Sequence, residues 1–332
     1  MTEIIKFREG ETVKLDYKDK RLLYELDFHA RDPLSRLAKR TGLSKQGVEY
    51  KINSLIKKGV IKGFYPVINV PKLGYKYCRL LLTLQNATEK DKDSLTGYFR
   101  AHKKVFWLFD MQGAYDLLIV IWAKDISEFK EFIEETESKY GYIIKRKVET
   151  IATDVIHYRY RFPVNIKETE EIHIRETDER VKIDEKDSRI LDLLVKNPKM
   201  PLVKMSHELG ESAKVIAYRI KRLEREKFIE AYRPIIGYNA LGYTYYKILI
   251  NLNKVAITES RKLKKYITEN PLIIYLIEGI GLPADLELEM VVSSNQELFN
   301  FINDLKEKFP KLIAEYTTVV FMDTLKVRYL PS

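Results

Sequence analysis

The stretch PLSRLAKRTGLSKQGVEYKINSLIKK, residues 33–58, decides the fold of the N-terminal region. Pro33 suits the first turn of a short helix, because its fixed φ is already helical. Gly42 can adopt the left-handed conformation that ends this helix, and Ser44 can cap the next one, 44–58. The apolar residues of that helix fall on one stripe, Val48, Ile52, Leu55 and Ile56. Two helices joined by a tight glycine turn, the second amphipathic and basic, predict a helix-turn-helix motif.

A further helix and a strand flank this motif. Leucines at helical spacing between Leu15 and Leu26 follow acidic residues, which suit a helix N-terminus. Gly59 ends the third helix, and the apolar run 61–70 then predicts a strand. The N-terminal residues 1–62 are therefore expected to form a helix-turn-helix domain of the winged type.

The chain repeats this pattern with a period of 168 residues, because residues 15–84 lie over residues 183–252 without a gap. The matched identities are Asp16 with Asp184, Asp19 with Asp187, Arg21 with Arg189, Pro33 with Pro201, Gly42 with Gly210, Ser44 with Ser212, Tyr50 with Tyr218, Pro66 with Pro234, and Leu73-Gly74-Tyr75 with Leu241-Gly242-Tyr243. The period is far longer than that of a solenoid repeat. The sequence therefore predicts a duplicated multi-domain unit.

A second pattern follows each helix-turn-helix region. Its order is strand, helix, strand, strand, helix, strand, which is the ferredoxin-like arrangement. In the first copy the expected elements cover 77–84, 90–102, 105–111, 115–123, 127–140 and 143–160. In the second copy they begin near Tyr245, Glu259, Leu272, Asp285, Asn295 and Leu312. The predicted fold class is α+β, a duplicated unit of a winged helix-turn-helix domain and a ferredoxin-like βαββαβ domain.

These patterns divide the chain into five segments. The first copy has its helix-turn-helix domain at 1–62 and its regulatory domain at 63–162, and the second has them at 183–230 and 231–332. The segment between them, 163–182, reads PVNIKETEEIHIRETDERVK. It is dense in alternating charges and poor in large apolar residues, which predicts a linker. Its Ile-x-Ile pattern leaves a short strand open.

The composition indicates a globular protein with a basic surface. Hydrophobic residues make up 45% and charged residues 32%, and the formal charge is +10. This charge favours a polyanionic partner, either nucleic acid or an anionic membrane surface. Apolar runs such as 117–123 are far shorter than the roughly 20 residues that span a bilayer, and the single cysteine, Cys78, excludes an internal disulfide. We expect a cytoplasmic protein with no membrane partner.

Six short motifs, in a fixed order, carry a family resemblance. They are Leu15-Asp16-x-x-Asp19, Leu37-Ala38, Gly42-Leu43-Ser44, Ile61-x-Gly63-Phe64, Leu73-Gly74 and Gly113-Ala114-Tyr115-Asp116. With the order of elements they strongly resemble the Lrp/AsnC (feast/famine) family of transcriptional regulators. That family reads double-stranded DNA with the third helix, pairs subunits through its strands, and binds small effectors, often amino acids, where regulatory domains meet. Since the usual member has one copy, the resemblance implies an intramolecular pseudo-dimer here, with a homodimer or higher oligomer still open.

The resemblance makes the polar face of each third helix the expected DNA reader. Lysine and serine can hold phosphates, glutamine and asparagine can pair with adenine, and lysine can reach guanine. The candidates in the first copy are Arg36, Lys39, Arg40, Ser44, Lys45, Gln46, Tyr50, Lys51, Asn53 and Lys57. Those in the second copy are Ser212, Lys214, Tyr218, Arg219, Lys221 and Arg222. A solvated charged face is the alternative, and the second copy has acids that repel phosphates, namely Glu208, Glu211, Glu224 and Glu226.

The turn at 113–116 is the expected effector site. Glycine lets a backbone approach a ligand, and Asp116 can accept a hydrogen bond from an amino group or from a backbone amide. Gly113, Tyr115 and Asp116 are therefore the candidate residues. A tight hairpin turn with no ligand explains them equally well. In the second copy the corresponding stretch, 281–285, is one residue longer and contains a proline.

Catalytic chemistry has little support in the sequence. The five histidines are scattered without metal-ligand or triad spacing, and there is no phosphate-binding glycine loop. We predict no catalytic residue, no metal and no cofactor, and a sequence-specific DNA-binding regulator tuned by a small molecule such as an amino acid. Two alternatives stay open, an enzyme of the sirohaem decarboxylase type, which resembles this family in fold, and a non-specific architectural DNA binder.

Overall fold

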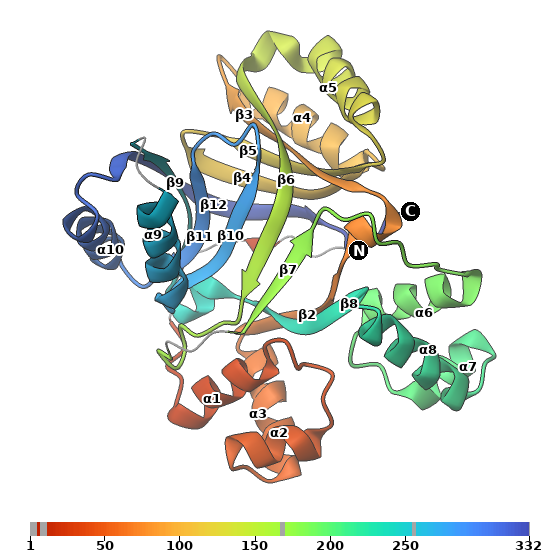
Figure 1. Ribbon diagram of the computed structural model, residues 1–332. Coiled ribbons are helices and arrows are strands. Elements are labelled where there is room, and N and C mark those ends of the chain that lie inside the picture. The colour runs from red at the N-terminus through yellow and green to blue at the C-terminus, as the bar shows by residue number, and fades with distance from the viewer. Residues whose placement is uncertain (1–4, 7–11, 167–169, 254–256, 332) are drawn as a thin grey trace.

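The computed structural model describes residues 5–6, 12–166, 170–253 and 257–331. Strands form the centre of the molecule, and groups of helices lie around them (Figure 1). In the part of the chain that is described, no helix is both long and apolar enough to cross a membrane.

Each copy opens with a three-helix module whose ends are set by local capping. The helices are α1 (Tyr17–Leu26), α2 (Leu34–Thr41) and α3 (Lys45–Lys57) in the first copy, and α6 (Glu185–Lys196), α7 (Leu202–Leu209) and α8 (Ala213–Arg225) in the second. Gly42 and Gly210 end α2 and α7 in the left-handed conformation, with φ of 63° and 68°. Ser44 and Ser212 cap α3 and α8 by accepting backbone hydrogen bonds. Both predicted helix-turn-helix modules are present.

Both copies continue in the predicted βαββαβ order. The elements of the first copy are β3 (Lys76–Leu84), α4 (Glu89–Ala101), β4 (Val105–Gly113), β5 (Leu117–Ala123), α5 (Ile126–Tyr140) and β6 (Ile144–Tyr158). Those of the second are β9 (Thr244–Leu252), α9 (Ile257–Glu269), β10 (Ile273–Ile280), β11 (Leu286–Val292), α10 (Asn295–Lys308) and β12 (Ile313–Val327). Each helix pair covers the outer face of its own sheet (Figure 1). The α+β fold class is confirmed.

The two regulatory sheets join into one closed ring of strands. β6 pairs through residues 144–152 with β3 of its own copy and through residues 151–157 with β10 of the other. In the same way, β12 pairs with β9 and, further along, with β4. The order around the ring is β12-β4-β5-β3-β6-β10-β11-β9, and the pairing of β9 with β12 closes it. Strand pairing therefore makes the two halves of one chain a pseudo-dimer.

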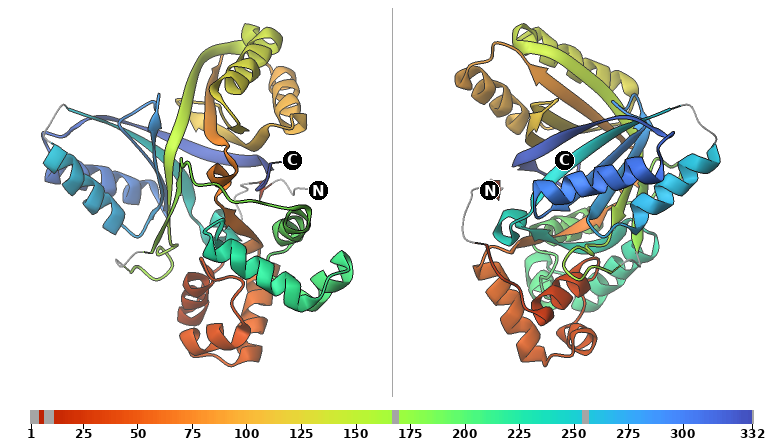
Figure 2. Two further views of the ribbon diagram at one scale, coloured as in Figure 1. Left: turned by 45° about the vertical axis from the view of Figure 1, so that its right-hand side comes forward. Right: turned by 90° about the vertical axis from the view of Figure 1, so that its left-hand side faces the viewer.

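Each helix-turn-helix module packs on connecting strands of both copies. The strands that follow them, β2 (Ile61–Ile68) and β8 (Ile229–Ile236), pair antiparallel. The core of α1–α3 includes Ile236 of the second copy, whereas the core of α6–α8 is continuous with Val67 of the first. Each module thus contacts the connecting strand of the other copy as well as its own, and the two modules lie on the same side of the ring (Figure 2).

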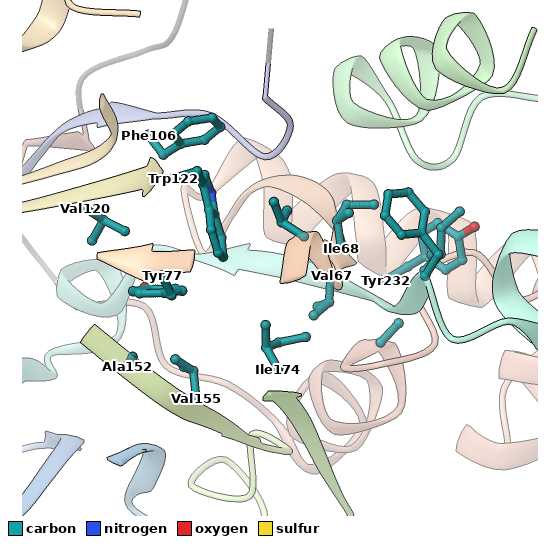
Figure 3. Packing of buried hydrophobic residues seen from close by; sticks show 14 of the residues in the cluster. Val67, Ile68, Tyr77, Phe106, Val120, Trp122, Ala152, Val155, Ile174 and Tyr232 are labelled. Atoms are coloured by element: carbon teal, nitrogen blue, oxygen red, sulfur yellow. The ribbon is translucent and has the colours of Figure 1, made fainter. Parts of the chain in front are cut away.

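A buried apolar core links these connecting strands to the first regulatory sheet. Figure 3 shows Val67 and Ile68 of β2 near Tyr77 of β3 and Trp122 of β5. The ring of Tyr77 packs edge-on against that of Trp122, with centroids 4.8 Å apart. The second helix-turn-helix module and the first regulatory sheet therefore share one continuous core.

The segment 163–182 takes part in the fold through a short strand. β7 (Glu171–Arg175) contains the Ile-x-Ile pattern and pairs with β6, and its Ile174 joins the core described above. The remaining short elements are β1 (Ile5–Lys6), which pairs with β12, and the 3-10 helices η1 (Val70–Leu73), η2 (Gly141–Ile143) and η3 (Tyr238–Leu241).

Candidate nucleic-acid interface

The helix α3 presents most of its predicted reading residues to solvent. Lys45, Gln46, Tyr50, Asn53 and Lys57 are exposed, and so is the acidic Glu49. Tyr50 keeps 74% of its surface, although an unpartnered aromatic ring usually avoids water. The Oγ atom of Ser44 accepts from Gly47 N at 3.0 Å, so this hydroxyl serves first as the helix cap. The buried stripe on the other side leaves the polar face free to enter a groove.

The helix α8 has a matching face of different chemistry. Lys214, Tyr218 and Lys221 are exposed, and Tyr218 keeps 65% of its surface at the position that Tyr50 has in α3. The two lysines stand where the first copy has amide side chains. The two helices therefore present matched geometry but different hydrogen-bonding groups.

Two of the acidic residues of the second module are engaged by neighbouring side chains. Glu211 forms an ion pair with Lys186, and Glu224 accepts a hydrogen bond from the Tyr232 hydroxyl at 2.9 Å. These contacts reduce the repulsion that free carboxylates would exert on a phosphate backbone.

Lys51 and Arg219 hold the reading helices against the helices that precede them. Lys51 Nζ lies 2.8 Å from Asp16 Oδ2 and 2.7 Å from Asp19 Oδ1, and both carboxylates belong to the capping box of α1. Burial tends to lower the pKa of Lys51, but the two carboxylates outweigh it and raise the pKa. Arg219 Nη1 makes the equivalent contacts in the second copy, including one of 2.9 Å to Asp187. The structure thus gives Lys51 and Arg219 a positioning role instead of a free DNA-contacting end.

Several of the predicted arginines are also paired. Arg36 Nη1 lies 2.9 Å from Asp32 Oδ1, and Arg40 Nη1 lies 3.3 Å from Asp32 Oδ2. Arg222 is paired with a buried carboxylate of α6 at 2.5 Å. Arg36, Lys39 and Arg40 are nevertheless exposed, and exposed ion pairs are weak enough for a phosphate to replace the carboxylate.

The two modules enclose a cleft of about 980 Å³ that both reading helices line. α3 contributes Ile52 and Asn53, and α8 contributes Ile220 and Lys221, which occupy the equivalent repeat positions. The cleft therefore lies across the pseudo-symmetric junction of the modules.

Two cations at equivalent repeat positions tie the modules together. Arg31 Nη1 donates to the carbonyl oxygen of Pro198, and Lys199 Nζ donates to that of Ala30 at 3.0 Å. Each cation also lies near an aromatic ring at equivalent positions of β8 and β2, 5.9 and 5.2 Å from the centroids. We call this reciprocal arrangement the Arg31–Lys199 latch. Two cations one repeat of 168 residues apart are the signal in the sequence that could have predicted it.

The predicted effector residue Asp116 serves the β4–β5 hairpin. Its Oδ2 atom accepts from Leu84 N at 2.7 Å. Asp285 accepts from Leu252 N at the same distance in the second copy, in spite of the different turn sequence. Because the contact recurs in both copies, it explains Asp116 as a hairpin-stabilising residue.

Gly113 and Tyr115 are also explained by local packing. Gly113 has a φ of +129°, and a Cβ atom there would lie 3.0 Å from the Thr318 carbonyl oxygen of β12. Tyr115 is buried, and the Arg146 guanidinium lies 4.9 Å from the centroid of its ring. Tyr115 and Asp116 therefore have contacts within their own copy, and Gly113 packs against β12 of the other.

A buried polar cluster that the sequence analysis missed joins α1, β8 and β6. Arg233 donates to both carboxylate oxygens of Asp27, at 2.7 and 3.0 Å. Its Nη1 atom lies 3.3 Å from His157 Nδ1, and its guanidinium lies 4.0 Å from the ring centroid of Tyr160. Burial, and then the charge of Arg233, lower the pKa of His157 well below its usual range. Histidine and arginine do meet here, in a closed cluster whose ionic charges compensate each other.

A second buried cluster lies inside the ring, where the two copies meet. Arg79 donates to the Glu287 carboxylate at 2.6 and 3.0 Å, and Lys247 contacts Glu287 and, at 2.8 Å, Glu289. Arg79 and Lys247 are equivalent repeat positions, but Glu287 corresponds to Leu118 in the strand register. Burial would raise the pKa of Glu287, yet the two cations hold it at about 2. The contact between the halves is therefore chemically asymmetric.

Comparisons with known proteins match each half separately. Residues 15–62 match the model of a winged helix-turn-helix DNA-binding domain, and residues 183–224 match that of the AsnC-type helix-turn-helix domain. The HTH-type transcriptional regulator LrpA of Pyrococcus horikoshii is 28% identical over 133 residues, 40% of this chain and 92% of LrpA. The chain is thus similar to regulators of the Lrp/AsnC family.

Other matches differ in how much of the chain they cover. The proline dehydrogenase transcriptional activator of Rhodobacter capsulatus is 26% identical over 130 residues, 39% of this chain and 84% of its own length. A crystal structure of the siroheme decarboxylase NirDL instead covers 95% of this chain and 93% of its own, with a TM-score of 0.62 and 11% identity. That likeness shows that the complete fold occurs in a solved structure, and it shows the fold alone.

Proposed function

We propose that this chain is a sequence-specific, DNA-binding transcriptional regulator of the Lrp/AsnC family. The observation that carries the proposal is the pair of helix-turn-helix modules, each with an exposed polar face on its third helix. The matched single-copy relatives are transcriptional regulators by name, which supports this function. The net charge of +10 suits a polyanionic partner.

In this proposal, the two modules read different bases. Gln46 and Asn53 of α3 suit adenine, whereas Lys214 and Lys221 of α8 suit guanine or phosphate. The β2–β8 pairing and the Arg31–Lys199 latch limit how far the two helices can move relative to each other. One chain therefore prefers two unlike half-sites in a fixed order. Arg36, Lys39 and Arg40 contact the DNA backbone beside the first half-site.

Fluorescence anisotropy with DNA fragments selected by binding tests the proposal. Lys45→Ala combined with Gln46→Ala should weaken specific binding at least tenfold, because each direct contact contributes about 1–3 kcal/mol. The control is Lys130→Ala, on the exposed side of α5 and far in the fold from α3, which should leave affinity unchanged. Binding should also weaken steeply with salt. An unchanged affinity in the double variant would remove α3 from the reading surface.

The proposal includes modulation by a small molecule such as an amino acid. Because Gly113, Tyr115 and Asp116 have the contacts of a hairpin, their substitution is expected to affect stability before any response to an effector. A DNA-binding regulator acts where the chromosome lies, so we place the chain in the cytoplasm. Assembly of pseudo-dimers into a homodimer or higher oligomer is measurable by light scattering.

We also propose that the chain is not an enzyme. The alternative, an enzyme of the sirohaem decarboxylase type, draws support from the likeness in fold over the whole chain. The His157–Arg233 cluster, however, is closed by Asp27 and by aromatic rings. The absorbance spectrum of the protein mixed with iron uroporphyrin separates the two readings. A stoichiometric shift of the tetrapyrrole band would favour the enzyme, whereas an unchanged spectrum favours the regulator.

A further inference from the structure

We propose that the cleft between the two helix-turn-helix modules binds a small organic carboxylate with an apolar body, which acts through the distance between the reading helices. The inference rests on the proposed function for its regulatory part, but the binding itself does not require DNA. It assigns the effector site to the DNA-binding modules instead of the regulatory sheets.

The size and floor of the cleft fit an apolar body. Its volume of about 980 Å³ lies at the upper end of the roughly 300–1,000 Å³ that is usual for small-molecule sites. Phe28, Ala30, Met200 and Tyr232 line it and are all buried. They give the cleft an apolar base, which favours the hydrocarbon part of a ligand over a polar group.

The cations of the latch fit a carboxylate. Arg31 and Lys199 both line the cleft, and their hydrogen bonds run to the carbonyl oxygens of Pro198, Met200 and Ala30. Burial, and then the neighbouring Arg31, lower the pKa of Lys199. An anion between these two partly buried cations would relieve their mutual repulsion. Its charge-assisted hydrogen bonds to them would be strong, because such bonds strengthen as water is excluded.

The other charged residues of the cleft are of both signs, since Lys221 and Lys227 line it together with four acidic residues. Asp32 is paired with Arg36 and Arg40 outside the cleft, and Glu230 accepts from Asn69 at 3.1 Å. The carboxylates of Glu49 and Glu224 line the walls formed by the reading helices. A second anionic group close to either of these two carboxylates would be repelled.

The backbone of the cleft carries a strained residue. Phe28 has a φ of +68°, which side-chain-bearing residues rarely adopt. Two hydrogen bonds hold it there, from Tyr232 N to Phe28 O at 3.1 Å and from Ala30 N to Tyr232 O at 3.0 Å. Non-glycine strain of this kind concentrates at ligand sites and switches. It therefore supports a binding role for this loop independently of the charges.

A ligand in the cleft would act on both modules at once. α3 lines it with Ile52 and Asn53, and α8 lines it with Ile220 and Lys221. Filling the cleft therefore fixes the separation of the reading helices, on which the fit to two half-sites depends. A ligand that binds one helix separation more tightly than another couples carboxylate binding to DNA binding. It raises DNA affinity when it favours the separation that fits the DNA site, and lowers it otherwise.

Calorimetric titration of the full chain without DNA tests the site. Phenylacetate and hexanoate are the probes, and phenylacetamide and hexanamide are matched neutral controls. We expect at least one carboxylate to bind with a Kd below about 1 mM, and its amide to bind at least tenfold more weakly. Lys199→Met should weaken the carboxylate at least tenfold, whereas Lys227→Met, which removes an exposed cleft lysine paired at 3.9 Å with Glu230, should not.

The outcomes separate the two proposals. The site is overturned if neither carboxylate binds, if the amides bind equally well, or if Lys199→Met binds as tightly as the unaltered chain. Should Lys199→Met fail to fold, Lys199→Arg keeps the charge and should keep the affinity, and the comparison with the amides needs no variant. Anisotropy with selected DNA then tests the coupling, for which we expect at least a threefold change in DNA affinity at saturating carboxylate. Carboxylate binding without any DNA binding would refute the proposed function and leave the site standing.

Discussion

Replacing Glu287 with leucine should strongly destabilise the union of the two halves. Glu287 is fully buried and bridges Arg79 of the first copy and Lys247 of the second. Without it, Lys247 would keep Glu289, whereas Arg79 would lose the carboxylate it is paired with. Removing one partner of a buried ion pair costs about 3–5 kcal/mol, which is a large part of a typical unfolding free energy of about 5–15 kcal/mol.

Urea unfolding followed by circular dichroism measures this effect. The matched control is Glu278→Leu, on the neighbouring strand β10. It removes a carboxylate from a more exposed pair with Lys264 of α9, and its cost should stay below about 1 kcal/mol. Arg79→Leu added to Glu287→Leu should recover much of the loss, since it leaves the balanced Lys247–Glu289 pair. A midpoint for Glu287→Leu equal to that of the control, or a double variant less stable than the single one, would refute the reasoning.

Three further predictions follow from the described contacts. Burial and Arg233 hold the pKa of His157 low only in the folded state, so His157 takes up a proton when the chain unfolds at acid pH. The free energy of unfolding should therefore fall as the pH drops below about 6.5, by at most about 1.4 kcal/mol per pH unit. In urea denaturation between pH 5 and 8, the free energy of unfolding should depend less on pH in His157→Phe than in the unaltered chain. The control His207→Phe, at an exposed position, should keep the pH dependence of the unaltered chain. Lys51→Met should lower the melting temperature and reduce DNA affinity less than Lys45→Ala does, and the reverse order would restore Lys51 as a reader. Asp116→Ala should cost about 1–3 kcal/mol in calorimetry because Leu84 N loses its acceptor, and an unchanged melting temperature would contradict the hairpin role.

The elements that the sequence predicted well are those with local signals. Gly42 and Ser44 act within one turn of chain, and the structure has the left-handed glycine and the serine cap at these positions. The repeat supplied the second module without further evidence, since Gly210 and Ser212 fall in the same register. The alternation of apolar residues likewise gave the order of the strands and helices in both sheets.

The features that the sequence did not predict depend on contacts between distant segments. Asp27 and Arg233 are 206 positions apart, and neither stands in a pattern that marks it as a partner of the other. Lys51 looked like a DNA contact because spacing places it on the polar face, but spacing does not show that Asp16 and Asp19 reach it. The asymmetry at Glu287 also needs the strand register, because only the ring brings it between Arg79 and Lys247.

The central claim is that one chain reads DNA with two unlike helices, and selection of bound fragments from random DNA tests it most directly. Sequencing of the selected pool should yield two different half-sites in a fixed order, about one DNA turn of roughly 34 Å apart. The spacing should vary little, because the β2–β8 pairing limits how far the two modules can move relative to each other. A pool with no enriched motif, or a short palindrome with two equal half-sites one turn apart, would contradict a pseudo-dimer that reads DNA with both of its helices.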